Sequence, residues 1–338
     1  MLNILYQFNE KYVPYAGVSI TSLLENNKES GDITIYLLGE DISEKSRRKL
    51  LDQIEIYGQQ AVFIDAGEVI RKMQDLGLNG YRDSYATNIK MFINHYIPET
   101  VKKLLYIDCD TIVTGNLSKL FEMDLKDKPI GMVLDSMCLR HKQAVGFSKK
   151  DLYFNGGVIL FDTQKWREQR CEARITEHIQ NVRAHYMAPD QDILNIVLKG
   201  QIKVLDIIYN FQPFHMVYTY EQYMRFFGQP RYYSKKRLEK ATEKVAIYHT
   251  FRYLGEFPWH RDSLHPAVTL FDKYLAKSLW SDYGKIETEK NDMVFRVERA
   301  LYKMLPKEVF IVVFKICYEI FMWKSNRDSL KNQNNSRM

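Results

Sequence analysis

A short apolar run, Leu104–Ile107, ends on two carboxylates that are one residue apart, Asp108 and Asp110, with Cys109 between them. Residues i and i+2 at the end of a strand point to the same side, so both carboxylates can reach one ion. Carboxylate oxygens favour Mg²⁺ or Mn²⁺ over zinc. An isolated pair of this kind would more often be two solvated aspartates in a turn. The spacing therefore indicates a divalent-cation site only when other residues support it.

Two further segments supply that support: Leu152–Asp162, which reads LYFNGGVILFD, and Pro189–Asn195, which reads PDQDILN. Together with the Asp-Cys-Asp segment they resemble the retaining glycosyltransferases of family 8, the group that includes bacterial lipopolysaccharide galactosyltransferases and glycogenin. The resemblance covers roughly residues 2–262. It implies a GT-A fold with a Rossmann-like nucleotide-binding sheet, a UDP-hexose donor and a divalent cation.

The resemblance implies that Asp108, Asp110 and His249 hold Mn²⁺, or Mg²⁺, against the donor diphosphate. His249 ends the segment VAIYH, which matches the strand-then-histidine pattern of the family. In this role the cation neutralises the charge that builds up on the UDP leaving group. Cys109 then lies among the donor-binding residues. Without the resemblance, His249 would be read as an ordinary histidine at a strand end.

The nucleotide and its phosphates are expected to contact four more residues. Asn9 stands where many family members have an aspartate that accepts a hydrogen bond from uracil, and an amide oxygen can also accept one. Tyr12 is placed to stack on the base, although a structural aromatic at a strand end is an alternative. Lys90 aligns with a family arginine near the donor and keeps the charge without the bidentate fork. The loop after His249 lacks the usual lysine, and Arg252 is the candidate replacement.

The donor hexose is expected to contact Asp135, Asn155, Asp190 and Gln191, because sugar hydroxyls need a fixed array of acceptors and donors. By resemblance, Gln191 lies near the anomeric carbon on the face opposite the leaving group, with Asp190 and Asp135 as the other candidate catalytic residues. A neutral amide is a poor nucleophile, so a front-face substitution with retention is implied. The Asn155-Gly-Gly segment also fits a tight turn.

Hydrophobic patterning predicts an α/β fold of the doubly wound, mostly parallel type, because short strands alternate with amphipathic helices. The predicted strands are rich in β-branched and aromatic residues and span Leu2–Phe8, Ile33–Leu38, Ala61–Ile64, Ile130–Leu134, Gly157–Phe161, Ile202–Leu205 and Val245–Tyr248. The predicted helices span Tyr15–Glu25, Ser43–Tyr57, Gln164–Tyr186, Gln191–Leu198 and Leu264–Leu279. Such sheets bind ligands at the carboxyl ends of their strands, where Asp108, Asp135 and His249 fall.

Composition sets further bounds. The 338 residues are 46% hydrophobic and 13% aromatic, enough for one large core with an appendage. The net charge of +6 is too diffuse to argue for nucleic acid. The four cysteines, at positions 109, 138, 171 and 317, have no Cys-X-X-Cys spacing and favour a reduced, cytoplasmic compartment. The first ten residues lack the basic and apolar regions of a secretory signal.

The composition divides the chain into a catalytic domain over residues 1–280, a polar linker over 281–295 and a tail over 296–338. The tail has nine Lys or Arg against four Asp or Glu, a net of +5, interleaved with aromatic residues. Its apolar run, Val309–Trp323, is shorter than the roughly 20 residues that span a bilayer. The run fits an interfacial helix on an anionic membrane; alternatively, its aromatic face packs on the domain. Residues 325–338 are expected to be disordered.

The sequence is therefore interpreted as a metal-dependent retaining glycosyltransferase that moves glucose or galactose from a UDP-sugar to a glycan acceptor, either a cell-surface polysaccharide or a lipid-linked precursor. A nucleotidyltransferase also pairs carboxylates on an α/β sheet, but it would carry an N-terminal Gly-rich phosphate loop, which this sequence lacks. A second alternative is an inactive glycan-binding or scaffold protein with the same fold. The altered loop after His249 and the lysine at position 90 keep that alternative open.

Overall fold

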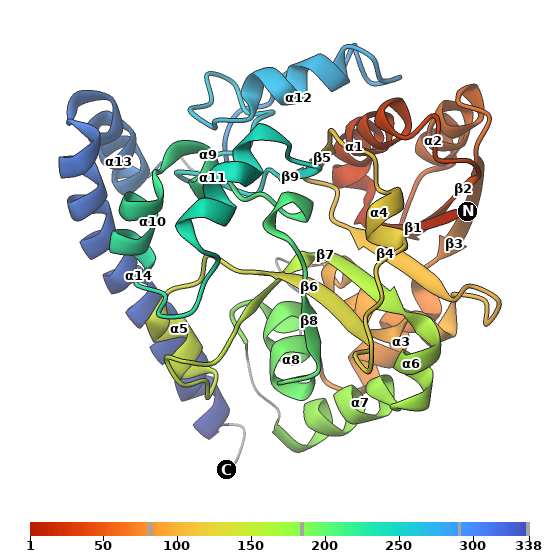
Figure 1. Ribbon diagram of the computed structural model, residues 1–338, viewed down its shortest axis with the longest axis horizontal. Helices are drawn as coiled ribbons and strands as arrows, with labels where there is room; N and C mark the ends of the chain where they lie inside the picture. The colour runs from red at the N-terminus through yellow and green to blue at the C-terminus, as the bar shows by residue number, and fades with distance from the viewer. Residues whose placement is uncertain (79, 81–83, 183–185, 290–291, 336–338) are drawn as a thin grey trace.

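The computed structural model describes residues 1–78, 80, 84–182, 186–289 and 292–335 (Figure 1). A seven-stranded sheet with the order β3-β2-β1-β4-β7-β6-β8 forms its centre. The strands are β1 (Leu2–Asn9), β2 (Ile33–Glu40), β3 (Gln60–Asp65), β4 (Lys103–Ile107), β6 (Ile130–Leu134), β7 (Phe154–Asp162) and β8 (Ile202–Val204). All neighbours pair in parallel except β7, which runs antiparallel to both β4 and β6. The predicted mostly parallel α/β sheet is confirmed.

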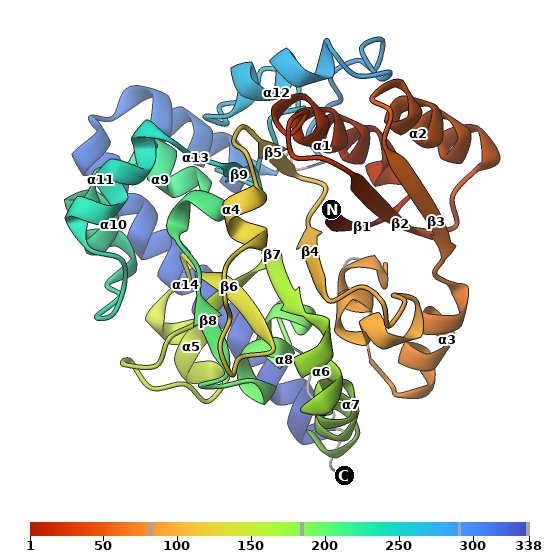
Figure 2. The ribbon, with the colours of Figure 1, turned by 45° about the vertical axis from the view of Figure 1, so that its right-hand side comes forward.

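Helices cover both faces of this sheet, which is why its central strands are buried on both sides (Figures 1 and 2). Side chains alternate along β1: Ile4 and Tyr6 join the apolar cluster on one face, and Leu5 joins the cluster on the other. On the Ile4 side lie α1 (Val13–Asn26), α2 (Glu44–Ile56) and α11 (Lys235–Glu243). On the Leu5 side lie α3 (Gly67–Asp75), η2 (Ala86–His95), α6 (Thr163–Glu168), α7 (Cys171–Val182) and α8 (Pro189–Val197).

Three predicted elements differ from the structure. The single helix expected over 164–186 is two helices, α6 and α7, because Arg170 adopts a left-handed conformation (φ 52°) between them; residues 183–185 lie outside the described part. The helix expected over 264–279 is α12 (Val268–Leu275). It starts after Pro266, since the residue before a proline disfavours helical geometry. It ends where the hydroxyl of Ser278 donates to the carbonyl of Leu275 (2.8 Å).

The strand expected over 245–248 belongs to a second, two-stranded sheet instead of the large one. There β9 (Ile247–His249) pairs antiparallel with β5 (Thr111–Val113), so that Thr111 lies opposite His249. Short elements connect the rest of the chain: η1 (Glu10–Tyr12), α4 (Ser118–Phe121), α5 (Leu139–Ala144), η3 (Ile207–Tyr209), α9 (Pro213–Val217) and α10 (Tyr220–Phe227).

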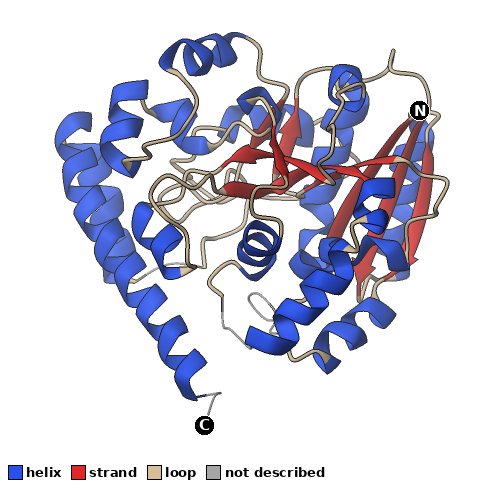
Figure 3. Cartoon of the chain, turned by 60° about the horizontal axis from the view of Figure 1, so that its bottom comes forward, coloured by secondary structure: helices blue, strands red, loops and turns tan. Residues whose placement is uncertain are grey.

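Two helices end the chain, α13 (Met293–Met304) and α14 (Lys307–Asn335), and α14 runs along one side of the molecule (Figure 3). α13 begins inside the segment predicted as a linker, and α14 continues to Asn335 through residues expected to be disordered. The inner face of α14 packs on the domain: Phe310 and Ile311 are buried in an aromatic cluster with α10 residues such as Phe226. In the described residues, no helix is both apolar enough and long enough to span a membrane.

Candidate active site

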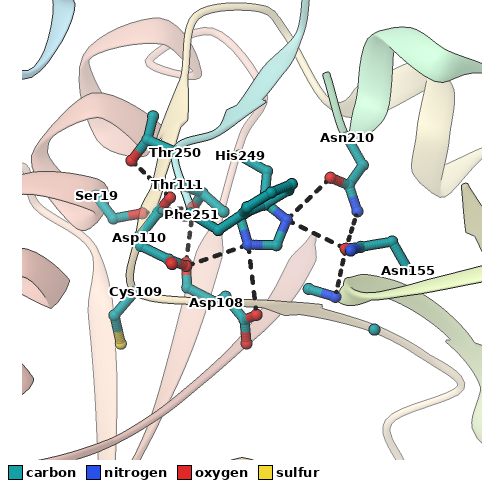
Figure 4. Close-up of polar contacts among 12 residues, drawn as sticks. Ser19, Asp108, Cys109, Asp110, Thr111, Asn155, Asn210, His249, Thr250 and Phe251 are labelled. Atoms are coloured by element: carbon teal, nitrogen blue, oxygen red, sulfur yellow. Dashed lines mark hydrogen bonds and ion pairs between the residues drawn. The ribbon is translucent and has the colours of Figure 1, made fainter. Parts of the chain in front are cut away.

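Asp108, Asp110 and His249 converge at one edge of the sheet (Figure 4). One potential ligand atom from each residue lies within 4.8 Å of the others. The Nε2 atom of His249 is 3.2 Å from Asp110 Oδ1 and 3.6 Å from Asp108 Oδ2. Pairing of β5 with β9 places the histidine there, and the backbone N–H and the hydroxyl of Thr250 both donate to the carbonyl of Asp110 (2.6 and 2.8 Å). The predicted meeting of these residues is confirmed, although through a different sheet.

The imidazole of His249 is oriented by two amide oxygens. Its Nδ1 lies 3.1 Å from Asn155 Oδ1 and 3.0 Å from Asn210 Oδ1, so Nδ1–H donates and Nε2 faces the carboxylates (Figure 4). Burial lowers the pKa of His249, but Asp110 and Asp108 outweigh burial and hold its pKa above the usual value. Partners of this kind fix the tautomer of metal-ligating histidines. Two carboxylates and one imidazole, oriented in this way, fit a divalent cation.

Asp108 connects this cluster to the rest of the site. The hydroxyl of Tyr106 donates to Asp108, and the ammonium of Lys90 lies 3.6 Å from it. Burial raises the pKa of the Asp108 carboxyl, and the charge of Lys90 opposes that rise. Lys90 is only 1% exposed, and it also contacts Asp190 Oδ2 (2.7 Å) and the carbonyl of Gly156 (2.9 Å). Its charge is therefore shared between two carboxylates inside the site.

A buried hydrogen-bonded array occupies the region next to Lys90. The side-chain amide of Gln191 donates to Asp135 Oδ2 (2.9 Å) and accepts from the backbone N–H of Gly156 (2.8 Å). The amide of Asn155 donates to the other oxygen of Asp135 (2.9 Å). Burial raises the pKa of the Asp135 carboxyl. The residues predicted to contact the hexose are thus neighbours.

The antiparallel direction of β7 explains why Asn155 belongs to this group. β4 and β6 bring Asp108 and Asp135 to the site at their carboxyl ends, whereas β7 brings Asn155 at its beginning. The glycines after Asn155 allow a close approach: a Cβ atom at Gly157 would lie 2.0 Å from Cε1 of His249. Gly157 is therefore required for the histidine to reach the carboxylates.

Unpaired amides lie at the end of β1, on the expected nucleotide side. In the described residues, Asn9 Oδ1 and both amide atoms of Gln7 are buried without a hydrogen-bond partner. Such atoms are costly unless a ligand satisfies them. The Cys109 thiol donates to the carbonyl of Gln7 (3.4 Å), and burial keeps its pKa well above the usual value. Tyr12 makes edge-on contacts with Tyr15 and Trp259.

Arg252 is placed less directly than the other predicted residues. Its guanidinium pairs with Glu289 (3.1 Å) and lies over the ring of Phe257 (5.0 Å). The contacts found within the described ranges do not join it to Asp108 or Asp110. A role of Arg252 at the diphosphate stays a prediction.

Several residues of the site were missed in the sequence. Gln7 and Asn9 are two residues apart at the end of a strand, as Asp108 and Asp110 are, and that shared spacing could have revealed Gln7. Asp192 lies inside the motif PDQDILN and forms contacts away from the donor region. Tyr106 and Tyr153 also lie inside singled-out segments, the apolar run before Asp108 and LYFNGGVILFD, where a tyrosine in an apolar run gives no signal of its own. The others come from segments without a motif: Asn210, His141 and Asn326.

A family model described as glycosyl transferase family 8 matches residues 3–263. The chain belongs to this family. The lipopolysaccharide 1,2-glucosyltransferase of Escherichia coli K12 is 27% identical over 324 residues, which cover 94% of this chain and 90% of that protein. General stress protein A of Bacillus subtilis is 24% identical, covering 84% of this chain and 96% of that protein.

The fold of this family 8 glycosyltransferase is shared with a solved structure of the galactosyltransferase LgtC in complex with donor and acceptor sugar analogs. The TM-score is 0.66 at 23% identity, with 88% of this chain and 99% of that chain covered. The family and the GT-A fold expected from the sequence are therefore confirmed.

Proposed function

We propose that this glycosyltransferase transfers glucose or galactose from a UDP-sugar to a glycan acceptor with retention of anomeric configuration, using Mn²⁺ or Mg²⁺. Family membership supplies the reaction class. The Asp108–Asp110–His249 cluster, immediately beside the buried array around Gln191 and Asp135, supports the donor and the metal most directly. The cluster suits a diphosphate-bound cation, and the array suits a sugar.

When bound, the cation would act as a Lewis acid that neutralises charge on the departing diphosphate. Asp108, Asp110 and His249 would hold it. Lys90 adds a positive charge beside Asp108 and, through Asp190, links the phosphate and hexose ends of the site. At the other end of the donor, the Gln7 amide and Asn9 Oδ1, which have no partner among the described residues, can supply a donor and acceptors for a uracil edge. Tyr12 is proposed to stack on the base.

The environment of Gln191 argues against a covalent intermediate on its amide. Its oxygen accepts from Gly156 and its nitrogen donates to Asp135, so the amide is held in place by hydrogen bonds, and a neutral amide is a poor nucleophile. We infer that Gln191 positions the hexose while the carboxylates of Asp135 and Asp190 stabilise positive charge at the anomeric carbon. This arrangement supports a front-face substitution with retention, which is the mechanism that we propose.

The acceptor is proposed from the relatives and the tail. A lipopolysaccharide glucosyltransferase is among the similar proteins, which supports a cell-surface or lipid-linked glycan. The outer face of α14 exposes an apolar stripe consisting of Val309, Val312, Ile316, Ile320 and Trp323. With the +5 charge of residues 296–338, this stripe suits an anionic membrane surface at the cytoplasmic side.

Membrane contact is tested by sedimentation with anionic and neutral vesicles. The double variant Ile316→Asp/Ile320→Asp changes only exposed positions, so we expect it to fold and to lose binding to anionic vesicles. Lys45→Asp, which alters an exposed charge on α2, is the control and should still sediment. Equal sedimentation of the double variant and the wild type would exclude the stripe as the membrane contact.

The donor is tested by measuring UDP release from a panel of UDP-sugars with Mn²⁺ and no acceptor. We expect slow hydrolysis of one donor by the wild type, its abolition in Asp108→Asn and its retention in Asp75→Asn, an exposed carboxylate on α3. Absence of both UDP release and Mn²⁺-dependent UDP binding would favour the alternative, an inactive glycan-binding or scaffold protein.

A further inference from the structure

A continuous path of buried polar contacts joins α14 to the array around Gln191. It runs from Asn326 on α14 through His141 on α5 and Asp192 on α8 to Tyr153, which precedes β7, and then to Gln191. His141 is 1% exposed and Asp192 is fully buried. A helix that lies outside the family match at residues 3–263 thus reaches the donor region through side chains.

Each contact at the α14 end has a defined direction. The amide nitrogen of Asn326 donates to the carbonyl of Met322 (2.8 Å), which turns its oxygen toward His141 Nδ1 (3.0 Å). His141 Nε2 lies 2.7 Å from Asp192 Oδ1. Both ring nitrogens therefore face acceptors and both can donate, which is the pattern of an imidazolium. Burial lowers the pKa of His141, but Asp192 outweighs burial and the pKa lies above the usual value.

The contacts at the other end determine where the Gln191 amide lies. The hydroxyl of Tyr153 donates to Asp192, which leaves the phenol oxygen to accept from Gln191 Nε2 (3.3 Å). The same nitrogen donates to Asp135. The other Asp192 oxygen accepts from the backbone N–H of Ala188 (3.1 Å), just before α8 begins. Asp192 therefore orients both the phenol and the first turn of the helix that carries Gln191.

We propose that α14 is a positioning element of the active site. Asn326 and His141 hold Asp192 and Tyr153 in place, and these hold the Gln191 amide against Asp135. The inference rests on the proposed function, because it assigns Gln191 to the donor hexose. Asn326 and His141 are positioning residues, since they act through Asp192 and Tyr153.

The alternative is that Asn326 only helps α14 to pack. Packing that does not involve Asn326 is supplied toward the other end of α14, where Phe310 and Ile311 are buried. A packing defect there would lower stability and leave the contacts of Asn326 intact. Loss of the Asn326 oxygen would instead leave an imidazolium N–H without an acceptor and free His141 to turn away from Asp192. The two roles therefore predict different effects on turnover.

The test compares three variants of the full chain: Asn326→Leu, which removes the acceptor at similar volume; Asn326→Asp, which keeps an acceptor oxygen; and Phe310→Leu, the packing control. Melting temperature, kcat and the donor KM are measured for Mn²⁺-dependent hydrolysis of the UDP-sugar. We expect Asn326→Leu to lower kcat about tenfold with little change in KM, because the metal and nucleotide ends are untouched. Asn326→Asp should recover most of kcat, and Phe310→Leu should lower the melting temperature alone.

Equal kcat in Asn326→Leu and the wild type, or equal losses in Asn326→Leu and Phe310→Leu, would overturn the positioning role and leave the proposed function standing. A wild-type protein that hydrolyses no UDP-sugar and binds none with Mn²⁺ would overturn the proposed function and this inference together.

Discussion

The two ends of the site differ in how completely their polar groups are paired. At the proposed ligand end, which comprises Asp108, Asp110, His249, Gln7 and Asn9, the Asp108 and Asp110 side chains are 27% and 15% exposed, and the amides of Gln7 and Asn9 have buried atoms without partners in the described chain. At the α14 end, Asp192 is fully buried, and both of its oxygens accept hydrogen bonds. One end is arranged for a ligand that completes it, and the other is complete in the protein alone.

This difference predicts different consequences of substitution. A change at the ligand end should alter binding and activity more than folding, because its groups gain their partners only with the donor and the cation. A change at the α14 end should also cost stability, because it leaves a buried group unpaired in the protein itself, besides any loss of turnover that it causes through Gln191.

The largest effect is expected for His249→Ala at the ligand end. Removal of this proposed cation ligand should reduce donor hydrolysis at least about 100-fold, since a cation bound there would supply several kcal/mol of transition-state stabilisation. UDP release is measured over a Mn²⁺ titration, and excess Mn²⁺ should recover part of the activity. His178→Ala, on α7 away from the site, is the control. Full activity of His249→Ala would remove the histidine from the metal site.

The largest loss of stability is expected for Asp192→Asn at the α14 end. This change leaves the His141 imidazolium without its charged partner, so the free energy of unfolding should fall by about 3 kcal/mol. Urea unfolding at neutral pH measures the change. Asp127→Asn, whose ion pair with Lys128 is solvent-exposed, should have no measurable effect. If Asp192→Asn lowered the free energy of unfolding no more than Asp127→Asn does, the contacts of Asp192 would not stabilise the folded protein as described.

The contributions of two buried histidines, His215 and His141, to the free energy of unfolding should change with pH in opposite directions. Burial lowers the pKa of His215 to about 3, so the unfolded chain binds a proton near pH 6.5 and the folded chain does not. Stability from His215 is therefore lost as pH falls below about 6.5, by about 1 kcal/mol per pH unit. The raised pKa of His141 acts in reverse: its contribution is present at low pH and is lost as pH rises through its folded pKa.

Unfolding free energies at pH 6.5, 5.5 and 4.5 test this difference. Carboxylates titrate in the same range, so His215→Gln is measured beside the wild type and should show the shallower decline. Parallel declines in the two proteins would rule out a neutral, buried His215.

Gln7→Met is expected to have a smaller effect, which weakens donor binding without lowering the free energy of unfolding. The amide of Gln7 is buried and has no partner within the part of the chain that the structure describes, so the free energy of unfolding should stay equal or rise by up to about 1 kcal/mol in the ligand-free protein. The donor KM should rise severalfold, because a contact to the base is lost. Gln59→Met, which removes the contact of Gln59 Oε1 with the N–H of Ile33, serves as a control for donor KM and should not change it. Clear destabilisation by Gln7→Met would show that its amide is paired within the protein.

The smallest effect is expected for Arg252→Ala. Arg252 would have to exchange Glu289 for the diphosphate, so its net contribution should be modest, about a twofold to threefold rise in donor KM. Glu289→Gln should leave KM equal or lower it. Unchanged KM and kcat in Arg252→Ala would end its candidacy as the replacement for the family lysine.

The sequence predicted the Asp108–Asp110–His249 cluster because each of these residues follows a recognisable strand and motif. The sequence did not reveal that β7 is antiparallel to its neighbours, because strand direction is set by pairing between segments far apart in the chain. It is this direction that brings Asn155 to the same edge of the sheet as Asp108. Lys90 was predicted near the donor, but the position of its ammonium between Asp108 and Asp190 depends on tertiary packing. The contact of Asn326 with His141 joins residues that share no motif, and only the folded chain brings them together.

The pairing of β5 with β9 has a thermodynamic consequence. Asp110 and His249 belong to segments far apart in the chain, and they become neighbours only after β9 has docked. An ion that needs both segments binds the folded chain and not the unfolded one, so mass action makes it a stabiliser: free Mn²⁺ at about 100 times its Kd would add about 2.7 kcal/mol. A chelator should then lower the melting temperature of a sample that contains no sugar nucleotide at all, which makes the metal site detectable without knowledge of the substrate.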